Sequence, residues 1–258
     1  MATSDLSEDY TARFNNVARA YGGGGEVLLR LADAHVCVIG LGGVGSWVVE
    51  SLARSGVGKL TLIDMDEICI SNVNRQVMAQ SSTIGKFKAE ALRTRVLDIN
   101  PSAQVTMALN FVRPDNAEEL LTHKSPHAYA TANATATANA DGVSDKVAII
   151  DACVRSGTPV VTSGGVGGLL DPTLITITDL AHVTGDNLLM RVRKKLRQHS
   201  GYPSASERKA RRWGVKAVHT LPTDSSLGPG SVGSLRKCDV SFGNVCFATG
   251  VAGFMMAS

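Results

Sequence analysis

Alternating apolar and polar positions divide the first 110 residues into helices and strands. Apolar residues recur at helical spacing in some segments and form short uninterrupted runs in others. Strands that alternate with helices are typical of a Rossmann-like, doubly wound and mostly parallel sheet, so the pattern predicts an α/β fold. The predicted elements are helices over 9–33 (with a glycine break at 22–25), 44–55 and 85–99, and strands over 35–39, 60–63 and 104–109.

The second half of the chain is less regular. Residues 129–140 are almost wholly Ala, Thr and Asn, and this tract fits a period-2 strand and a low-complexity loop equally well. A segment rich in Pro, Gly and Ser at 222–234 predicts a mobile region. The other predicted elements are helices over 147–155, 188–196 and 242–256, and a strand over 159–162.

The charge of the chain is distributed unevenly. The total of +3 comes from 26 Lys and Arg residues against 23 Asp and Glu residues. Residues 191–216 alone carry ten basic residues and one acid, a net +9, which leaves −6 for the rest. The sequence therefore predicts an acidic body and a basic, partly flexible C-terminal region.

Composition also limits the location of the protein. The five cysteines include no C-x-x-C pair, which argues against a disulfide framework and against a paired-cysteine zinc site. The N-terminus resembles no signal or transit peptide, and the apolar run at 245–258 is too short to span a bilayer. These features predict a cytoplasmic protein. Attachment to the mitochondrial surface through a tail beyond Ser258 stays open as an alternative.

A glycine-rich turn carries the first chemical signal. Gly40-x-Gly42-x-x-Gly45 follows a predicted strand and opens a predicted helix, where backbone N–H groups and the helix N-terminus favour a phosphate. Asp64 ends the next strand, 19 residues past Gly45, where a carboxylate binds ribose hydroxyls. By themselves these features favour a dinucleotide such as NAD and an oxidoreductase.

The polar residues that follow favour a triphosphate instead. Asn72, Arg75 and Gln76 lie in one short segment, and Lys88 follows Gly85. Hydride transfer has no need of several cations, whereas attack at phosphorus requires the phosphate charge to be neutralised. Arg75 provides a planar fork for phosphate oxygens and Lys88 a point charge.

Together these motifs resemble the ThiF/MoeB/ubiquitin-activating adenylyltransferase superfamily. The resemblance covers about residues 10–180 and implies ATP and Mg²⁺ as cofactors, with Asp64 on the ribose and Asp141 on the metal. It also implies that Arg75, Lys88 and Asp141 act in catalysis. The nucleotide-binding residues that it implies are Gly40, Gly42, Gly43, Val44, Gly45, Asp64, Asp66, Asn72, Arg75, Gln76 and Lys88.

A narrower resemblance points to one branch of this superfamily. Residues 161–173 and 177–180, Trp47 and residues 13–22 are similar to the TcdA (CsdL) branch, the tRNA threonylcarbamoyladenosine dehydratases. This resemblance implies a homodimer in which the N-terminal segment reaches the partner's ATP site. It also implies ATP-dependent cyclisation of threonylcarbamoyladenosine in tRNA.

The chain departs from the superfamily pattern at two positions. Asn16 stands where an arginine is common, and Arg13 and Arg19 are the possible substitutes. Ala217 stands where a cysteine is common, so a thioester is not expected at that position. Cys238 and Cys246 are expected to be buried structural thiols.

The predicted tRNA partner gives the basic region a role, because Lys and Arg contacts to phosphate supply affinity that does not depend on sequence. No DNA partner is expected, and a sulfur-transfer or other modification partner stays unidentified. We expect an ATP-binding adenylation domain with a helical arm at 1–180, and a basic substrate-binding segment with a closing helix at 181–258. The predicted tRNA contacts are Arg191, Arg193, Lys194, Lys195, Arg197, Arg208, Lys209, Arg211 and Arg212.

Three other functions remain open from the sequence alone. One is an adenylyltransferase that activates a ubiquitin-like or sulfur-carrier protein, although that activity does not need a segment of charge +9. Another is an NAD-dependent oxidoreductase, which only the glycine turn and Asp64 favour. The third is a nucleotide-binding scaffold without activity, suggested by the Ala/Thr/Asn tract.

Overall fold

The strands form one mixed sheet at the centre of the molecule. The computed structural model describes residues 6–121, 128–132, 141–203, 212–221 and 243–258. Within these residues the strand order is β3-β2-β1-β4-β5-β7-β6. All neighbours are parallel except β6 and β7, which are antiparallel. The strands are β1 His35–Ile39, β2 Lys59–Ile63, β3 Gln104–Ala108, β4 Ala128–Ala132, β5 Val160–Ser163, β6 Ile175–Asp179 and β7 Lys216–Thr220.

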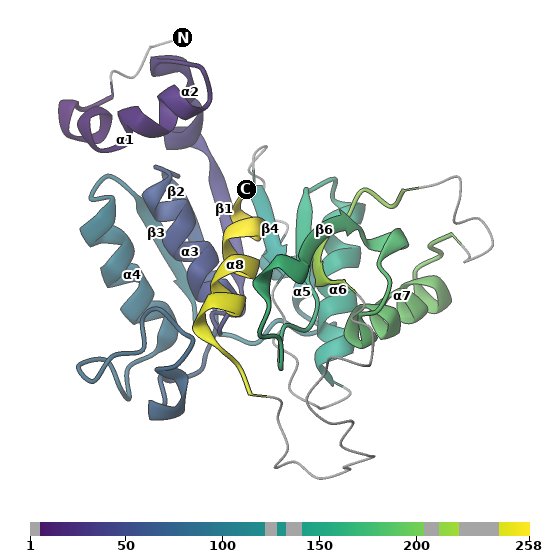
Figure 1. Ribbon diagram of the computed structural model, residues 1–258. Helices are drawn as coiled ribbons and strands as arrows, with labels where there is room; N and C mark the ends of the chain where they lie inside the picture. The colour runs from purple at the N-terminus through teal and green to yellow at the C-terminus, as the bar shows by residue number, and fades with distance from the viewer. Residues whose placement is uncertain (1–5, 122–127, 133–140, 204–211, 222–242) are drawn as a thin grey trace.

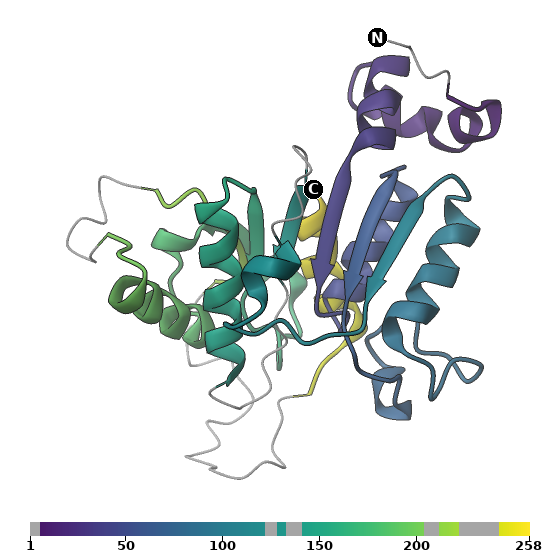
Figure 2. The same cartoon turned by 180° about the vertical axis from the view of Figure 1, so that it is seen from behind.

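Helices cover both faces of this sheet, as Figures 1 and 2 show. Helices α3, α4 and α8 pack on one face and α5, α6 and α7 on the other, while α1 and α2 form an arm at the N-terminal end. This arrangement confirms the predicted doubly wound α/β fold. The helices are α1 Glu8–Ala20, α2 Gly25–Asp33, α3 Gly45–Arg54, α4 Lys88–Ile99, α5 Ala117–Leu121, α6 Asp141–Arg155, α7 Asn187–His199 and α8 Cys246–Ala257.

The structure settles part of the ambiguous Ala/Thr/Asn tract. Residues 128–132 form β4, which lies between β1 and β5, so the start of the tract is a strand. The rest of the tract, 133–140, lies outside the described residues, as does the segment 222–234 that we expected to be mobile. Strands β6 and β7 and helix α5 were not predicted from the sequence.

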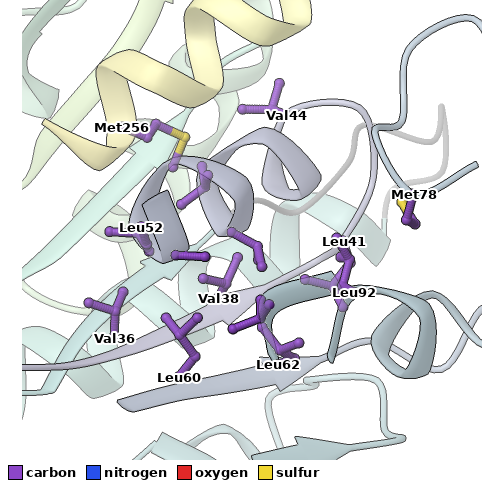
Figure 3. Packing of buried hydrophobic residues seen from close by; sticks show 14 of the residues in the cluster. Val36, Val38, Leu41, Val44, Leu52, Leu60, Leu62, Met78, Leu92 and Met256 are labelled. Carbon is purple, nitrogen blue, oxygen red and sulfur yellow. The ribbon is translucent and has the colours of Figure 1, made fainter. Parts of the chain in front are cut away.

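Apolar side chains of β1 and β2 pack against α3 to form the larger core. Figure 3 shows Val38 and Leu62 beneath α3, with Met256 reaching the same cluster from α8. A small separate core joins α1 to α2 through Tyr10, Phe14 and Leu28. The Tyr10 hydroxyl donates to the carbonyl of Gly56, which ties the N-terminal arm to the end of α3.

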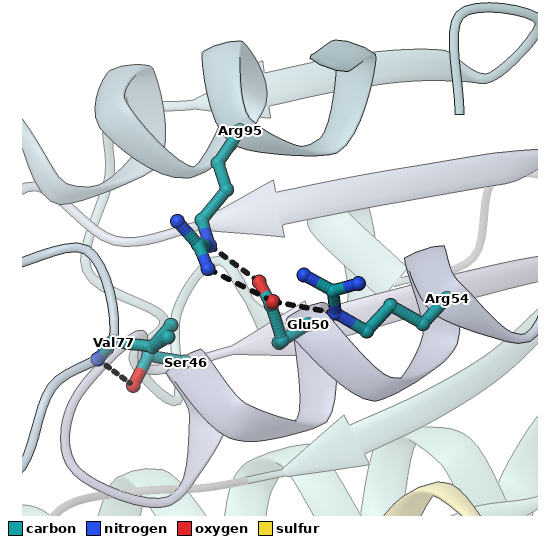
Figure 4. A network of polar contacts seen from close by, with 5 residues as sticks. All are labelled: Ser46, Glu50, Arg54, Val77 and Arg95. Atoms are coloured by element: carbon teal, nitrogen blue, oxygen red, sulfur yellow. Dashed lines mark hydrogen bonds and ion pairs between the residues drawn. The ribbon is translucent and has the colours of Figure 1, made fainter. Parts of the chain in front are cut away.

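A buried carboxylate links α3 to α4. Glu50 of α3 accepts hydrogen bonds from Arg54, one turn further along α3, and from Arg95 of α4 (Figure 4). Burial alone raises the pKa of Glu50, but the hydrogen bonds from Arg95 and Arg54 outweigh burial and hold that pKa below its ordinary value. The ionised carboxylate therefore stabilises the packing of the two helices that follow β1 and β2.

Helix α8 lies directly against α3 because a glycine faces the contact. A Cβ atom at Gly253 would lie 2.6 Å from Cβ of Trp47 and 2.8 Å from the carbonyl oxygen of Val44. The Trp47 and Phe254 rings pack edge to face, with centroids 5.8 Å apart. None of the described helices, α8 included, combines the length and hydropathy that crossing a bilayer requires.

We expect Gly253→Ala to be less stable than Gly250→Ala by about 1–3 kcal/mol, the usual cost of overpacking a close contact. The two positions share a helix, so any gain in helix propensity is the same for both. A Cβ at Gly250 meets only Trp47, at 3.8 Å, which is ordinary van der Waals contact. Free energies of unfolding from urea titrations measure the difference, and equal values would show that α8 can move away from α3 at no cost.

Candidate functional site

The glycine turn connects β1 to α3 at the carboxyl edge of the sheet. Gly40 adopts φ 80°, a backbone conformation that favours glycine. The N–H of Leu41 donates to Oδ2 of Asp64 at 2.7 Å, so the end of β2 fixes the start of the turn. Helix α3 begins at Gly45, and its N-terminus is directed at the space above the turn. The predicted strand-turn-helix context is confirmed.

Asp64, Asp66 and Lys88 form a charged group beside this turn. The Lys88 ammonium is 2.6 Å from Oδ2 of Asp66, and the N–H of Asp66 donates to Oδ1 of Asp64 at 2.8 Å. Burial raises the pKa of Asp64, while the Lys88 charge and the two backbone N–H groups act in the opposite direction. Lys88 is itself buried, at 6% exposure, so its charge acts in a poorly solvated environment.

Arg75 also contacts the glycine turn. A Cβ atom at Gly43 would be only 3.4 Å from Cδ of Arg75, so the missing side chain lets the arginine stem rest on the turn. The guanidinium donates to the carbonyl of Ser71 and to Oδ1 of Asn74. The structure thus brings together a glycine turn and two cations that are 13 residues apart in sequence.

Two buried amides complete this group. Oδ1 of Asn72 accepts from the N–H of Cys69, so this side chain helps to shape its own loop. Gln76 is 6% exposed, and among the described residues its Oε1 has no hydrogen-bond partner. A buried polar atom without a partner is energetically costly, so Oε1 of Gln76 is an unsatisfied acceptor in the residue that follows Arg75.

The predicted metal ligand, Asp141, lies at the start of a helix. Asp141 is the first residue of α6, which follows β4, the strand next to β1. Its side chain lies outside the described part of the chain. Its position after the carboxyl end of β4 parallels that of the glycine turn after β1.

Sequence reasoning missed a buried lysine five residues further along α6. Lys146 is fully buried and donates to Oγ1 of Thr162 at 3.1 Å and to the carbonyl of Ser163 at 2.9 Å. Burial lowers the pKa of Lys146 to about 7, and the Asp186 carboxylate acts in the opposite direction. The sequence held a signal: one lysine among the apolar residues of that helix.

The basic segment is only partly exposed. Arg191, Lys194 and Arg212 are exposed, and Lys195 donates to Oγ of Ser144 on α6. Arg191, Lys194 and Lys195 line a surface cavity of about 280 Å³ between α6 and α7. Arg197 packs over the ring of Trp213 and donates to the carbonyl of Pro203. Arg208, Lys209 and Arg211 lie outside the described residues.

Two sequence expectations are wrong in the structure. Arg193 is only 6% exposed and donates to the carbonyl of Ala181, because it lies on the apolar side of α7 with Leu189 and Val192. It is therefore no surface contact for a large ligand. Cys246 is exposed rather than buried, since it starts α8 at the edge of the core.

The fold and site define a nucleotide-binding protein of the doubly wound α/β class. The sequence profile of the ThiF family matches residues 15–256. The chain therefore belongs to the ThiF family, as the motifs predicted.

Within that family the chain is similar to one group of enzymes. It is 39% identical to a tRNA threonylcarbamoyladenosine dehydratase from Haemophilus influenzae, over 97% of this chain and 92% of that protein. Identity to the enzyme of the same name from Escherichia coli is 37%, over 98% of this chain and 93% of that one. The crystal structure of the Escherichia coli enzyme TcdA with ATP superposes with a TM-score of 0.83 at 36% identity, covering 98% of this chain and 93% of that one. These similarities confirm the predicted branch.

Proposed function

We propose that this chain uses ATP to dehydrate threonylcarbamoyladenosine in tRNA to its cyclic form. The similarity over nearly the whole chain to dehydratases of that name carries the proposal. The similarity to an ATP-bound TcdA structure supports ATP as the nucleotide. The contact of Arg75 with Gly43, and the link from Lys88 through Asp66 and Asp64 to the glycine turn, support the position of the ATP site.

The chemistry follows from the need to activate a carboxylate. An oxygen of the threonyl carboxylate attacks the α-phosphorus of ATP, forming an acyl-adenylate and releasing pyrophosphate. The neighbouring carbamoyl group then attacks the acyl carbon, and AMP leaves with the former carboxylate oxygen, so the nucleoside loses one water. The second step is fast because the attack is intramolecular and the reacting groups are already close together. Arg75 and Lys88 disperse the negative charge that develops during phosphoryl transfer, and Asp64 holds the ribose.

Mg²⁺ is proposed as the metal that accompanies ATP. This ion is usually held by one or two carboxylates together with substrate phosphates. Asp141 is the proposed carboxylate, and Lys88 and Arg75 beside the glycine turn provide positive charge for the phosphate oxygens that Mg²⁺ does not neutralise. The metal would neutralise the phosphates.

Exposed basic residues around α7 are the proposed contact for the tRNA backbone. Neutralising Arg191, Lys194, Lys195 and Arg212 to Gln is expected to weaken tRNA binding and to reduce its salt dependence. The slope against log salt should fall by about 0.9 for each duplex phosphate that the variant no longer neutralises. Binding titrations at several salt concentrations measure both quantities. Neutralising exposed Arg30 and Arg93 on α2 and α4 serves as the control. Unchanged affinity in the α7 variant would place the tRNA elsewhere.

One experiment tests the function as a whole. The protein is incubated with ATP, Mg²⁺ and tRNA that carries threonylcarbamoyladenosine, and the nucleosides are analysed by mass spectrometry. Loss of one water from that nucleoside is the expected result. No mass change would contradict the proposal, and ATP-dependent adenylation of a ubiquitin-like or sulfur-carrier protein would favour the alternative. We further propose that the enzyme acts as a cytoplasmic homodimer, which sedimentation and cell fractionation test.

A further inference from the structure

The side chain of Asn74 connects Arg75 to the C-terminal part of the chain by two hydrogen bonds. Its Oδ1 accepts from Nη1 of Arg75 at 2.9 Å, and its Nδ2 donates to the carbonyl of Asn244 at 2.7 Å. Only one orientation of the amide satisfies both contacts. The reverse orientation would set NH₂ against the guanidinium and a carbonyl oxygen against another carbonyl oxygen.

The main chain of Arg75 is held from the same direction. The indole N–H of Trp47 donates to the carbonyl of Arg75 at 3.0 Å. The Thr249 hydroxyl of α8 approaches that same carbonyl at 3.5 Å, and its methyl group lies 3.2 Å from where a Cβ of Gly43 would be. Arg75 therefore contacts the glycine turn, α3 and the C-terminal helix at once.

The guanidinium keeps capacity for a ligand in this arrangement. Within the described part of the chain, both side-chain hydrogen bonds of Arg75 are made through Nη1. An arginine has five N–H donors in a fixed plane. Because two protein acceptors fix Nη1, the plane of the fork is set while Nη2 and Nε are left for phosphate oxygens.

We infer that Asn74 is a positioning residue for Arg75, oriented by the segment that leads into α8. This inference rests on the proposed function, because it assigns Arg75 to the ATP phosphates. Asn74 itself touches no reacting atom in this scheme. Asn74 restricts the orientation of the guanidinium before ATP binds, so less conformational entropy is lost on binding. Groups that are preorganised in this way bind their ligand more tightly.

A double-mutant cycle on ATP affinity tests the inference. Calorimetric titration with Mg²⁺-ATP compares the unsubstituted chain, Asn74→Ala, Arg75→Ala and the double variant. Asn74→Ala is expected to weaken ATP binding about fivefold, in line with the usual net contribution of one hydrogen bond. In the Arg75→Ala background the same substitution is expected to change affinity less than about twofold, because contacting residues are not additive. Since Asn74 is exposed, the variant should fold normally.

Asn116→Ala is the matched control. Asn116 is half-buried, and both ends of its amide are also hydrogen-bonded, to the N–H of Arg113 and the carbonyl of Phe111, but on a loop before α5. It should leave ATP affinity unchanged. Equal weakening by Asn74→Ala in both backgrounds, or no weakening with Arg75 present, would overturn the positioning role. An unsubstituted chain that binds no ATP would overturn the proposed function too, so the two failures are distinguishable.

Discussion

Arg75→Ala is expected to lower ATP–pyrophosphate exchange, measured with threonylcarbamoyladenosine-containing tRNA, by about two to three orders of magnitude. Loss of a preorganised group that stabilises transition-state charge typically has an effect of this size. The aliphatic stem of Arg75 rests on Gly43 of the glycine turn, which places the guanidinium near the proposed phosphate site. The effect on folding should be small, because the contacts of this side chain with Ser71 and Asn74 are exposed.

The control for Arg75→Ala is Arg93→Ala. Arg93 is an exposed arginine on α4, outside the N-terminal arm. It should retain full exchange activity. Arg75→Ala with normal exchange would remove the glycine turn from the proposed active site, whereas lost exchange together with a lowered melting temperature would indicate misfolding. Thermal unfolding of both variants is therefore recorded alongside.

Asp141→Asn is expected to abolish Mg²⁺-dependent activity. The substitution keeps size and hydrogen bonding but removes the charge that a hard cation requires. Because Asn matches Asp in size, the melting temperature should change little. Exchange activity is measured over a range of Mg²⁺ concentrations, and partial rescue at high Mg²⁺ would agree with a weakened metal site.

Asp115→Asn provides the comparison for Asp141→Asn. Asp115 is an exposed aspartate on the loop before α5, so its loss of charge should leave the Mg²⁺ dependence unchanged. Wild-type activity of Asp141→Asn at low Mg²⁺ would exclude Asp141 as the metal ligand. The ligand would then have to come from another carboxylate, and Asp66 beside Lys88 would be the first to substitute.

Local sequence signals predicted the elements of the N-terminal half of the fold. They also predicted the glycine turn, Asp64, Arg75 and Lys88 as parts of the site. Strands β1 and β2 are short segments with mostly buried apolar residues, and the glycine turn and Asp64 follow them directly. The same local pattern therefore predicted both the strands and the position of the site residues. Arg75 and Lys88 were found because cations that follow a glycine turn suit the phosphates of a triphosphate, and the family resemblance implied the same two residues. Even so, the sequence could not show that Gly43 makes room for the stem of Arg75.

Sequence alone was less informative where long-range contacts decide the outcome. Strand β7 pairs with β5 across more than 50 residues, and β6 joins as an antiparallel edge strand, which no local pattern encodes. Arg193 was wrongly predicted to be an exposed tRNA contact. Its side chain is buried in the fold, where it donates to the carbonyl of Ala181. Lys146 was missed because a lone lysine on a helix is normally solvated.

The sequence by itself determined the class of the fold, the glycine turn and the family, because these depend on periodicity and on motifs that are contiguous in the chain. The tertiary structure decided how distant segments serve one site. Helix α8, more than 170 residues after Arg75, contacts its carbonyl through Thr249, and the segment before α8 orients Asn74. The physical reason is that a side chain's orientation depends on its partners in space, and the chain brings those partners together only when it folds.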